Sequence, residues 1–337
     1  MTSPARVVGS LVAAVVHGTA GAAELTCADT VLRTPLSLSR RIGFVALAGG
    51  SGTSATAGSV ASLLASRRAG TVLAVDAGAG SVGLGWQTGA LTPGAGQGPD
   101  PELAALRQTA RSREEARQGL SRTTAGLYLL DLAEAGRRAP AVATWRGSVT
   151  PIARFFDLVV TDWGVRPWAG DLEEVADASN VVAVVARADR HAACAAAAVI
   201  PRLLGRPAAP RVLLVLVDVG HTSDRIAAGL RRRLDVPVLA LGYERERARF
   251  VAPDSSRFSA RTRRGHIRVA TAVVSEAIGS SAASPPLTSR TAVPAGRCAS
   301  GTARPGSPRR CRSKSRRRSR PRPRCRTATS AARRCRR

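Results

Sequence analysis

The feature that most constrains this chain is a repeated alternation of short apolar runs with longer mixed segments. Each run is six or seven residues long and rich in Val, Leu and Ala. Strands that are apolar on both faces are typical of a parallel sheet covered by helices on both sides. The runs are 42–47, 71–76, 126–132, 157–162, 180–186, 211–217 and 236–241. We therefore expect an α/β fold, a doubly wound, mostly parallel sheet of about seven strands with helices on both faces.

The mixed segments supply the predicted helices and the place to look for a site. Ligands of doubly wound sheets bind outside the carboxyl ends of the strands. In this chain those ends are the loops that follow residues 47, 76, 162 and 217. The segments predicted to be helical are 55–68, 101–118, 141–154, 190–204, 223–234 and 261–279.

Charge divides the chain into a moderately basic body and an extremely basic tail. The first 280 residues carry 33 basic and 23 acidic residues, whereas residues 281–337 carry 18 basic residues and no acidic ones. The tail has no apolar period, so we expect it to be disordered. The domain organisation that follows is an N-terminal extension, partly helical, over 1–39, one α/β domain over 40–280, and an Arg-rich tail over 281–337.

Targeting and redox features are weak. Residues 7–16 form an apolar run after Arg6 that superficially resembles a secretory signal, but Gly9 and Ser10 interrupt it and it is shorter than a membrane span. We interpret it as part of the extension. The six cysteines show no C-x-x-C pair or paired histidines, which favours reduced thiols in a cytoplasmic protein. No transmembrane segment is predicted.

A glycine-rich loop follows the first predicted strand and precedes a predicted helix. Residues 48–54 have the sequence AGGSGTS. Glycines allow backbone N–H groups to turn inward, and a helix N-terminus adds a positive dipole end, so this junction is the context of a phosphate loop. The standard motif G-x-x-x-x-G-K-[ST] is not met. Ala48 stands in place of its first glycine and Thr53 in place of its lysine.

The same loop resembles the deviant Walker A motif of the MinD/ParA family of P-loop ATPases, K-G-G-x-G-K-[ST]. Four further segments are similar to that family, in the same order along residues 40–250. They are LAVDAG ending near Asp76, FFDLVVTD ending at Asp162, RVLLVLVDVG, and LDVPVLALGYERE. The resemblance implies a SIMIBI-class P-loop domain that binds ATP and Mg²⁺.

The resemblance assigns roles to individual residues. It implies that Ser54 and Asp162 hold Mg²⁺, the latter through water, and that Asp76 is the catalytic candidate. The nucleotide would lie on the loop, which consists of Gly49, Gly50, Ser51, Gly52, Thr53, Ser54 and Ala55.

Departures from the family pattern bear on function. Both family lysines are missing, at Ala48 and Thr53, and Lys314 in the tail is the only lysine in the chain. Gly78 replaces the second acid of the family's V-D-x-D segment, and its adenine-reading asparagine falls at Val217 or Asp218. Catalysis of phosphoryl transfer depends on positioning and charge neutralisation. We therefore expect a degenerate member with weak or absent hydrolysis.

Three functional hypotheses remain open. The first is a MinD/ParA-like, ATP-binding regulatory or positioning protein that forms a nucleotide-dependent homodimer. The second is a pseudo-ATPase scaffold that binds an unidentified protein partner. The third is a protein that binds nucleic acid or an anionic membrane surface through its basic tail, by charge alone. An alternative explanation of the tail is an out-of-frame end of the gene. All three hypotheses place the protein in the cytoplasm, with peripheral binding to membrane or nucleoid as a variant.

Overall fold

The computed structural model describes residues 21–80, 82–90, 100–133, 138–206, 209–248 and 257–282. Almost all of the predicted basic tail, with its four cysteines, lies outside these residues, as does the apolar run 7–16. Within the described residues Cys27 and Cys194 are free and exposed. None of the described helices is both long enough and apolar enough to cross a membrane.

The strands form one eight-stranded sheet in the order β3-β4-β2-β5-β1-β6-β7-β8. All pairs are parallel except β3 with β4. Seven strands match the predicted runs, and the α/β fold prediction is confirmed. The strands are β1 (Arg40–Ala46), β2 (Val72–Asp76), β3 (Ser121–Arg122), β4 (Tyr128–Asp131), β5 (Leu158–Val165), β6 (Val181–Arg187), β7 (Arg211–Val217) and β8 (Val238–Leu241).

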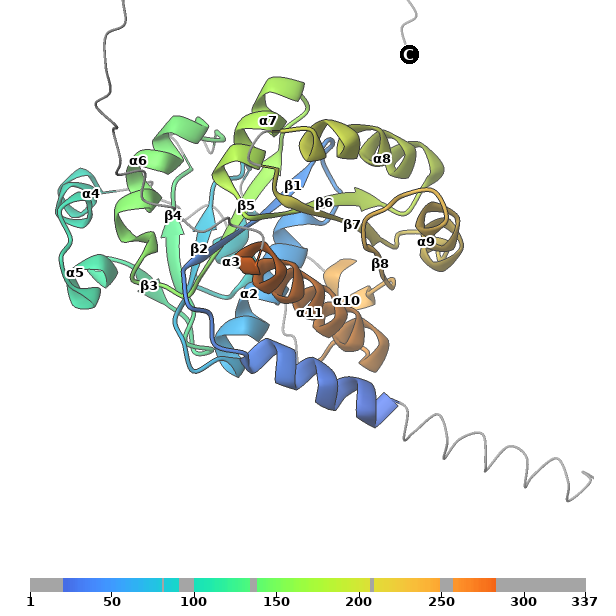
Figure 1. The fold of residues 1–337 in the computed structure, drawn as a ribbon, viewed down its shortest axis with the longest axis horizontal. Helices are drawn as coiled ribbons and strands as arrows, with labels where there is room; N and C mark the ends of the chain where they lie inside the picture. The colour runs from blue at the N-terminus through green and yellow to red at the C-terminus, as the bar shows by residue number, and fades with distance from the viewer. Residues whose placement is uncertain are drawn as a thin grey trace, which may run out of the picture. The chain divides into compact units, whose positions relative to one another are not determined.

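Helices connect these strands and cover both faces of the sheet. They are α2 (Thr53–Arg67), α3 (Leu84–Gln87), α4 (Pro101–Gln108), α5 (Arg113–Arg117), α6 (Val142–Ala153), α7 (Ala169–Ala178), α8 (Arg190–Leu204), α9 (Ser223–Arg231), α10 (Arg245–Ala248) and α11 (Ala260–Ala282). In Figure 1, α6, α7 and α8 lie along one side of the sheet and α2 and α11 along the other.

The predicted helix over 101–118 is two helices, and a capping box explains the break. The Ser112 hydroxyl accepts a hydrogen bond from the Glu115 backbone N–H at 3.1 Å, and the Glu115 carboxylate accepts one from the Arg111 N–H at 2.6 Å. A reciprocal pair of this kind satisfies the free N–H groups at a helix start. The polar sequence Arg111–Ser112 therefore begins a new helix.

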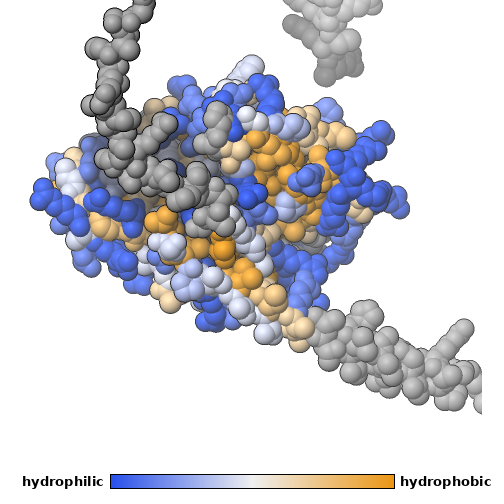
Figure 2. Space-filling model, in the orientation of Figure 1, coloured by the Kyte–Doolittle hydropathy of each residue, from blue (hydrophilic) through white to orange (hydrophobic). Residues whose placement is uncertain are grey.

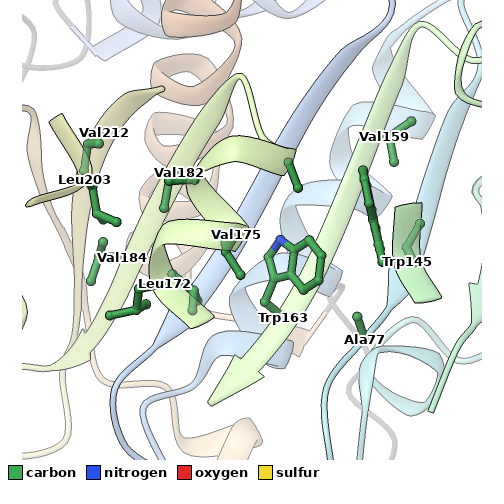
Figure 3. Packing of buried hydrophobic residues seen from close by; sticks show 14 of the residues in the cluster. Ala77, Trp145, Val159, Trp163, Leu172, Val175, Val182, Val184, Leu203 and Val212 are labelled. Atoms are coloured by element: carbon green, nitrogen blue, oxygen red, sulfur yellow. The ribbon is translucent and has the colours of Figure 1, made fainter. Parts of the chain in front are cut away.

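Two apolar cores lie on the two faces of the sheet. On the α6–α9 face, Trp145 and Trp163 are both buried, with ring centroids 5.3 Å apart, and they pack among Val159, Leu172 and Val175 (Figure 3). The opposite core joins β1 and β5 to residues of α2 and α11. Outside these cores the surface is largely hydrophilic, with an apolar patch beside α7 and α8 (Figure 2).

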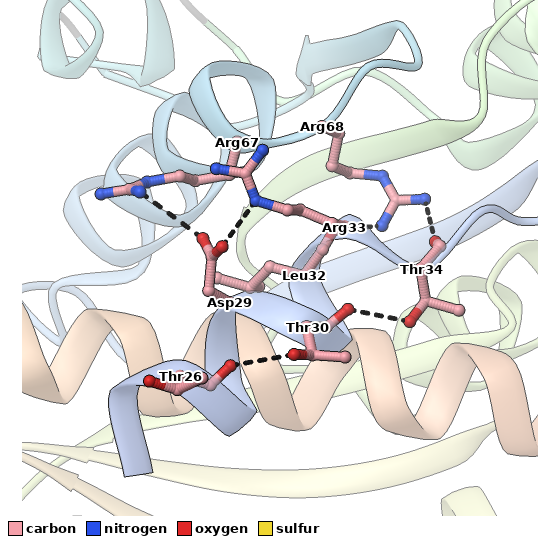
Figure 4. Close-up of polar contacts among 8 residues, drawn as sticks. All are labelled: Thr26, Asp29, Thr30, Leu32, Arg33, Thr34, Arg67 and Arg68. Atoms are coloured by element: carbon pink, nitrogen blue, oxygen red, sulfur yellow. Dashed lines mark hydrogen bonds and ion pairs between the residues drawn. The ribbon is translucent and has the colours of Figure 1, made fainter. Parts of the chain in front are cut away.

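A helix over residues 21–33 packs against the α2–α11 face of the sheet. Leu32 of this helix is 2% exposed. The guanidinium of Arg68, which follows α2, donates to the carbonyls of Leu32 at 2.6 Å and Thr34 at 2.8 Å (Figure 4). Glu24 forms a two-pronged ion pair with Arg268 of α11, at 2.6 and 3.1 Å. Apolar burial and polar contacts thus join this segment to the sheet domain.

The chain reverses its winding direction at β1 and β6. From β1 it passes through α2 to β2 on one side, and from the neighbouring β6 it passes through α8 to β7 on the other. Such a reversal is the topological switch point of a doubly wound sheet, where ligands bind. The glycine-rich loop that follows β1 lies at this point.

Candidate functional site

The loop between β1 and α2 is held in a curled conformation by its own residues. Gly50 and Gly52 have φ angles of 70° and 79°, in the left-handed region that glycine adopts without strain. The Ser51 hydroxyl donates to the Ala48 carbonyl at 2.6 Å. A Cβ added at Gly49 or Gly50 would meet no atom within 4 Å, so the loop is open to solvent at these two positions. A curled glycine-rich loop of this kind can cradle an anion with its backbone N–H groups.

The start of α2 completes the cradle. Gly52 is its N-cap and provides no side-chain cap. The first N–H groups of a helix have no acceptor within that helix and attract anions. Thr53, where the family has a lysine, is buried, and Ser54 is half-buried. The loop therefore offers backbone N–H groups and hydroxyls but no side-chain cation.

Val217, at the end of β7, packs against the loop. A Cβ at Gly52 would lie 3.3 Å from a methyl group of Val217. This contact leaves little room for any side chain at position 52. It also means that Val217 supports the loop instead of supplying the polar group that the family uses at this place.

Two aspartates lie side by side at the carboxyl edge of the sheet. Asp76 of β2 and Asp162 of β5 are register partners, and they are 1% and 0% exposed. Each carboxylate accepts a hydrogen bond from a backbone N–H two residues further on, from Gly78 at 3.2 Å and from Gly164 at 3.0 Å. Both side chains are therefore fixed next to the loop by their own turns.

The ionisation of Asp162 is strongly perturbed. Burial, followed by the neighbouring Asp76, raises the pKa of Asp162 from 3.8 to about 7. The Ser54 hydroxyl, the Gly164 N–H and Arg166 lower that pKa in part. The second oxygen, Oδ2, has no donor in ordinary hydrogen-bonding geometry, although Ser54 is close enough to stabilise the charge.

Arg166 joins three segments beneath this edge. Its side chain is buried and donates to the carbonyls of Trp163 at 3.1 Å, Ala77 at 3.0 Å and Pro140 at 2.9 Å. Burial lowers the pKa of Arg166, against the opposing effect of nearby carboxylates. Because its Nε and Nη2 groups donate to carbonyls of three segments, Arg166 braces this edge of the sheet.

Gly78, just after β2, and Gly164, near the end of β5, bring the two backbones into contact. A Cβ on Gly164, which has φ of 62°, would lie 2.9 Å from the Cα of Gly78. A Cβ on Gly78 would lie 3.5 Å from Asp76 Oδ1 and 3.7 Å from Asp162 Oδ2. An acid at position 78, as in the family, would thus point at the aspartate pair, and here that third acid is absent.

Asp218 lies in the loop between β7 and α9 and is not arranged to bind a base. Its carboxylate accepts hydrogen bonds from the Gly220 N–H at 3.0 Å, the Thr222 N–H at 3.2 Å and the Ser223 hydroxyl at 2.8 Å. Burial would raise the pKa of Asp218, but these hydrogen bonds outweigh it and the pKa is lowered. The residue is only 6% exposed, so Asp218 is not a solvated loop acid.

The structure brings the predicted site residues to one edge of the sheet. The acids Asp76 and Asp162 lie next to the start of α2, and Ser54 contacts Asp162. Sequence reasoning missed Arg166, whose only signal was a charged residue closing an apolar strand. Of the two tryptophans near Asp162, Trp163 is buried and Trp168 is 73% exposed, so they do not form one wall.

The residues present fit a Mg²⁺ ion that is held mainly through water. Mg²⁺ keeps several waters and binds through one or two protein oxygens plus substrate phosphates. Ser54 is a suitable direct ligand, and the buried Asp162 Oδ2 is an acceptor suited to a metal-bound water. In the part of the chain that is described, no three His, Cys, Asp or Glu side chains cluster as a metal site, so a cage made of protein ligands alone is not present there.

Comparison with solved structures identifies the fold. A ParA family ATPase from Chlorobium tepidum matches with a TM-score of 0.50 and 16% identity, covering 72% of this chain and 98% of that one. MinD from Pyrococcus horikoshii, complexed with Mg-ADP, matches with a TM-score of 0.49 and 16% identity, covering 68% of this chain and 94% of that one. Cobyrinic acid a,c-diamide synthase from Mycobacterium smegmatis, with bound ADP and magnesium, matches with a TM-score of 0.45 and 18% identity, covering 69% of this chain and 93% of that one.

Sequence comparison adds nothing to this result, since no protein-family model and no curated protein matches the chain. The predicted P-loop fold of the MinD/ParA kind is confirmed by the ParA structure.

Proposed function

We propose that this chain, which has the fold of the ParA and MinD ATPases, is a nucleotide-binding regulatory or positioning protein. In this proposal its degenerate loop binds Mg·ATP weakly and hydrolyses it slowly or not at all. One observation carries the proposal. An open loop with two left-handed glycines begins α2 close to Ser54 and to Asp162, whose buried Oδ2 has no hydrogen bond of ordinary geometry.

Binding would depend on the backbone and on the metal. The backbone N–H groups of residues 49–54 would bind the phosphates, and Ser54 with Asp162 would hold Mg²⁺, the latter through water. When bound, Mg²⁺ supplies the charge neutralisation that the triphosphate requires. The acid pair opposes a bare polyphosphate, so ATP should bind only together with the metal.

Hydrolysis would be poor because two positive charges are missing. Ala48 and Thr53 occupy the lysine positions, and the Arg166 donors are used on backbone carbonyls. Asp76, the catalytic candidate, has no second acid at Gly78 to assist it. In this proposal, nucleotide binding would regulate homodimer formation, and the protein would act at the periphery of the membrane or the nucleoid.

A second function, a pseudo-ATPase scaffold for a protein partner, is favoured by the same losses. The packing of Val217 against Gly52 maintains the loop without a ligand. A third, polyanion binding through residues 281–337, predicts that deletion of the tail abolishes nucleic-acid binding and leaves the body folded. If binding survives the deletion, the basic body is responsible.

Calorimetry of Mg·ATP binding to the full chain tests the proposal. Gly49→Glu puts a negative charge on the loop without backbone strain, Ser54→Ala removes the metal-side hydroxyl, and Asp162→Asn removes the metal-side charge. Gly147→Glu, at an exposed and equally open glycine of α6, is the matched control. We expect binding at millimolar ATP that the first three variants weaken and the control keeps. No binding by a folded wild-type chain would leave the scaffold function.

A further inference from the structure

A second cavity lies on the α2–α11 face of the sheet, away from the phosphate loop. Its volume is about 440 Å³, within the range of small-molecule sites. Its walls are the outer side of α2, the first turns of α11, residues 87–88 at the end of α3, and residues 124–125 before β4. Neither the phosphate loop nor the aspartate pair contributes to it.

Hydroxyl groups line the α2 side of this cavity. Ser59, Ser62 and Ser66 are spaced by three and four residues, which places them on one face of the helix. Thr88 and Thr124 add two hydroxyl groups from the segments at the rim. The Ser66 hydroxyl donates to the Leu63 carbonyl at 2.9 Å, and the Thr88 hydroxyl donates to the carbonyls of Leu84 and Gly85 at 3.0 and 3.1 Å. A hydroxyl rotates to suit its acceptor, so these two would turn away from their helices to reach a ligand. With that rotation, the wall offers several hydrogen bonds to one oxygen-rich group.

The charged side chains on the described walls are all arginines. Arg67 comes from the end of α2 and Arg263 from α11, and His266 lies one turn beyond Arg263. Arg67 is also 3.5 Å from Asp29, but that acid is closer to Arg33, at 2.6 Å. Guanidinium groups recognise phosphate and carboxylate with paired hydrogen bonds. The charge of the walls thus selects an anion.

The remaining lining residues are apolar. Leu63 and Ile267 lie beside the polar groups, and the Phe258 ring packs against His266 with centroids 5.9 Å apart. We propose that this cavity binds a small organic anion, with a phosphate group held by the arginines and serines and an apolar body held by Leu63, Ile267 and Phe258. The inference does not depend on nucleotide binding at the loop. Ser59 is five residues beyond Ser54, or about 7.5 Å along the helix.

Calorimetry with phenyl phosphate and the full chain tests this proposal. We expect wild type to bind phenyl phosphate more tightly than either inorganic phosphate or phenol, because only the first uses both parts of the cavity. Arg263→Gln should weaken binding about tenfold, the equivalent of one charge-assisted hydrogen bond. Arg264→Gln is the matched control, since Arg264 is exposed, adjacent in sequence, and lines a different cavity.

Two further variants separate the outcomes. Ser62→Asp puts a negative charge in the wall and should abolish binding even if Arg263→Gln fails to fold. Gly49→Glu disables the phosphate loop and should leave phenyl phosphate binding unchanged. Equal binding by wild type and both cavity variants would overturn the proposal, as would loss of binding in Gly49→Glu, which would place the anion at the loop.

Discussion

Asp76 and Asp162 are register partners on adjacent parallel strands, and the protein buries both carboxylates at the carboxyl edge of its sheet. Each is held by the backbone turn that follows its own strand. Because burial and mutual repulsion both oppose a second negative charge, the pair is a source of instability in the metal-free protein. That cost is consistent with a site built for a cation.

The raised pKa of Asp162 predicts that Asp162→Asn stabilises the protein at high pH. The folded-state pKa of about 7 lies above the ordinary value of 3.8, so the folded protein holds this proton more tightly than the unfolded chain. The resulting stability is fully present below about pH 4 and is lost as pH rises through 7. We expect the substitution to add roughly 2–4 kcal/mol at pH 8 and much less at pH 5.

Urea unfolding at the two pH values measures this difference. Asp235→Asn, at an exposed acid, is the control and should change stability by less than about 0.5 kcal/mol. A gain from Asp162→Asn that is the same at pH 5 and pH 8 would show that Asp162 does not titrate between them.

Replacing Arg166 should destabilise the protein at the carboxyl edge of its sheet. Arg166→Met keeps much of the volume but leaves the carbonyls of Trp163, Ala77 and Pro140 without their donor, and we expect a loss of roughly 3 kcal/mol. Arg146→Met, at an exposed arginine of α6, is the control. Denaturant midpoints measure both. If the two variants lose the same small amount of stability, water has replaced the guanidinium of Arg166 and its three hydrogen bonds contribute little to the free energy of unfolding.

The helix over residues 21–33 should contribute to stability mainly through Leu32. Leu32→Ala removes a side chain that is 2% exposed and should cost about 2–3 kcal/mol, whereas Leu38→Ala, at 63% exposure, should cost little. Glu24→Gln should cost less than about 1 kcal/mol, since its ion pair with Arg268 is open to solvent. Thermal unfolding of the three variants ranks these losses of stability. A larger loss from Glu24→Gln than from Leu32→Ala would contradict it.

Restoring a lysine should strengthen nucleotide binding. Thr53→Lys returns a cation to the start of α2, and one charge-assisted hydrogen bond to a phosphate corresponds to about a tenfold gain in Mg·ATP affinity. Calorimetry measures the gain, with Thr222→Lys before α9 as a control at another helix start. No gain in a folded Thr53→Lys variant would mean that the cradle does not accept a triphosphate.

The sequence predicted the strands because they are apolar on both faces. It did not predict β3, whose two residues are polar and exposed and pair only because β4 provides an edge. It did not predict α7, where the mixed segment after Asp162 gave no clear period. Helix α8, by contrast, matches its predicted range of 190–204 because its Ala-rich sequence has strong helical propensity.

The loop was predictable because the glycines, the strand before it and the helix after it are all local. The aspartate pair followed from a simple rule, that parallel strands end at the same edge. The bracing by Arg166 was not predictable, because Ala77 and Pro140 lie 89 and 26 residues away in sequence. The support of Gly52 by Val217 was equally hidden, since it depends on how β7 sits relative to the start of α2.

The ion pair between Glu24 and Arg268 joins residues 244 positions apart. On the ribosome the helix that carries Glu24 is made early, but α11 is synthesised only after all eight strands. Until then the buried face of Leu32 lacks part of its cover, and an exposed apolar face of this kind attracts chaperones or other chains. The domain therefore closes only after α11 has been synthesised, and a chain that stops before α11 should aggregate instead of folding.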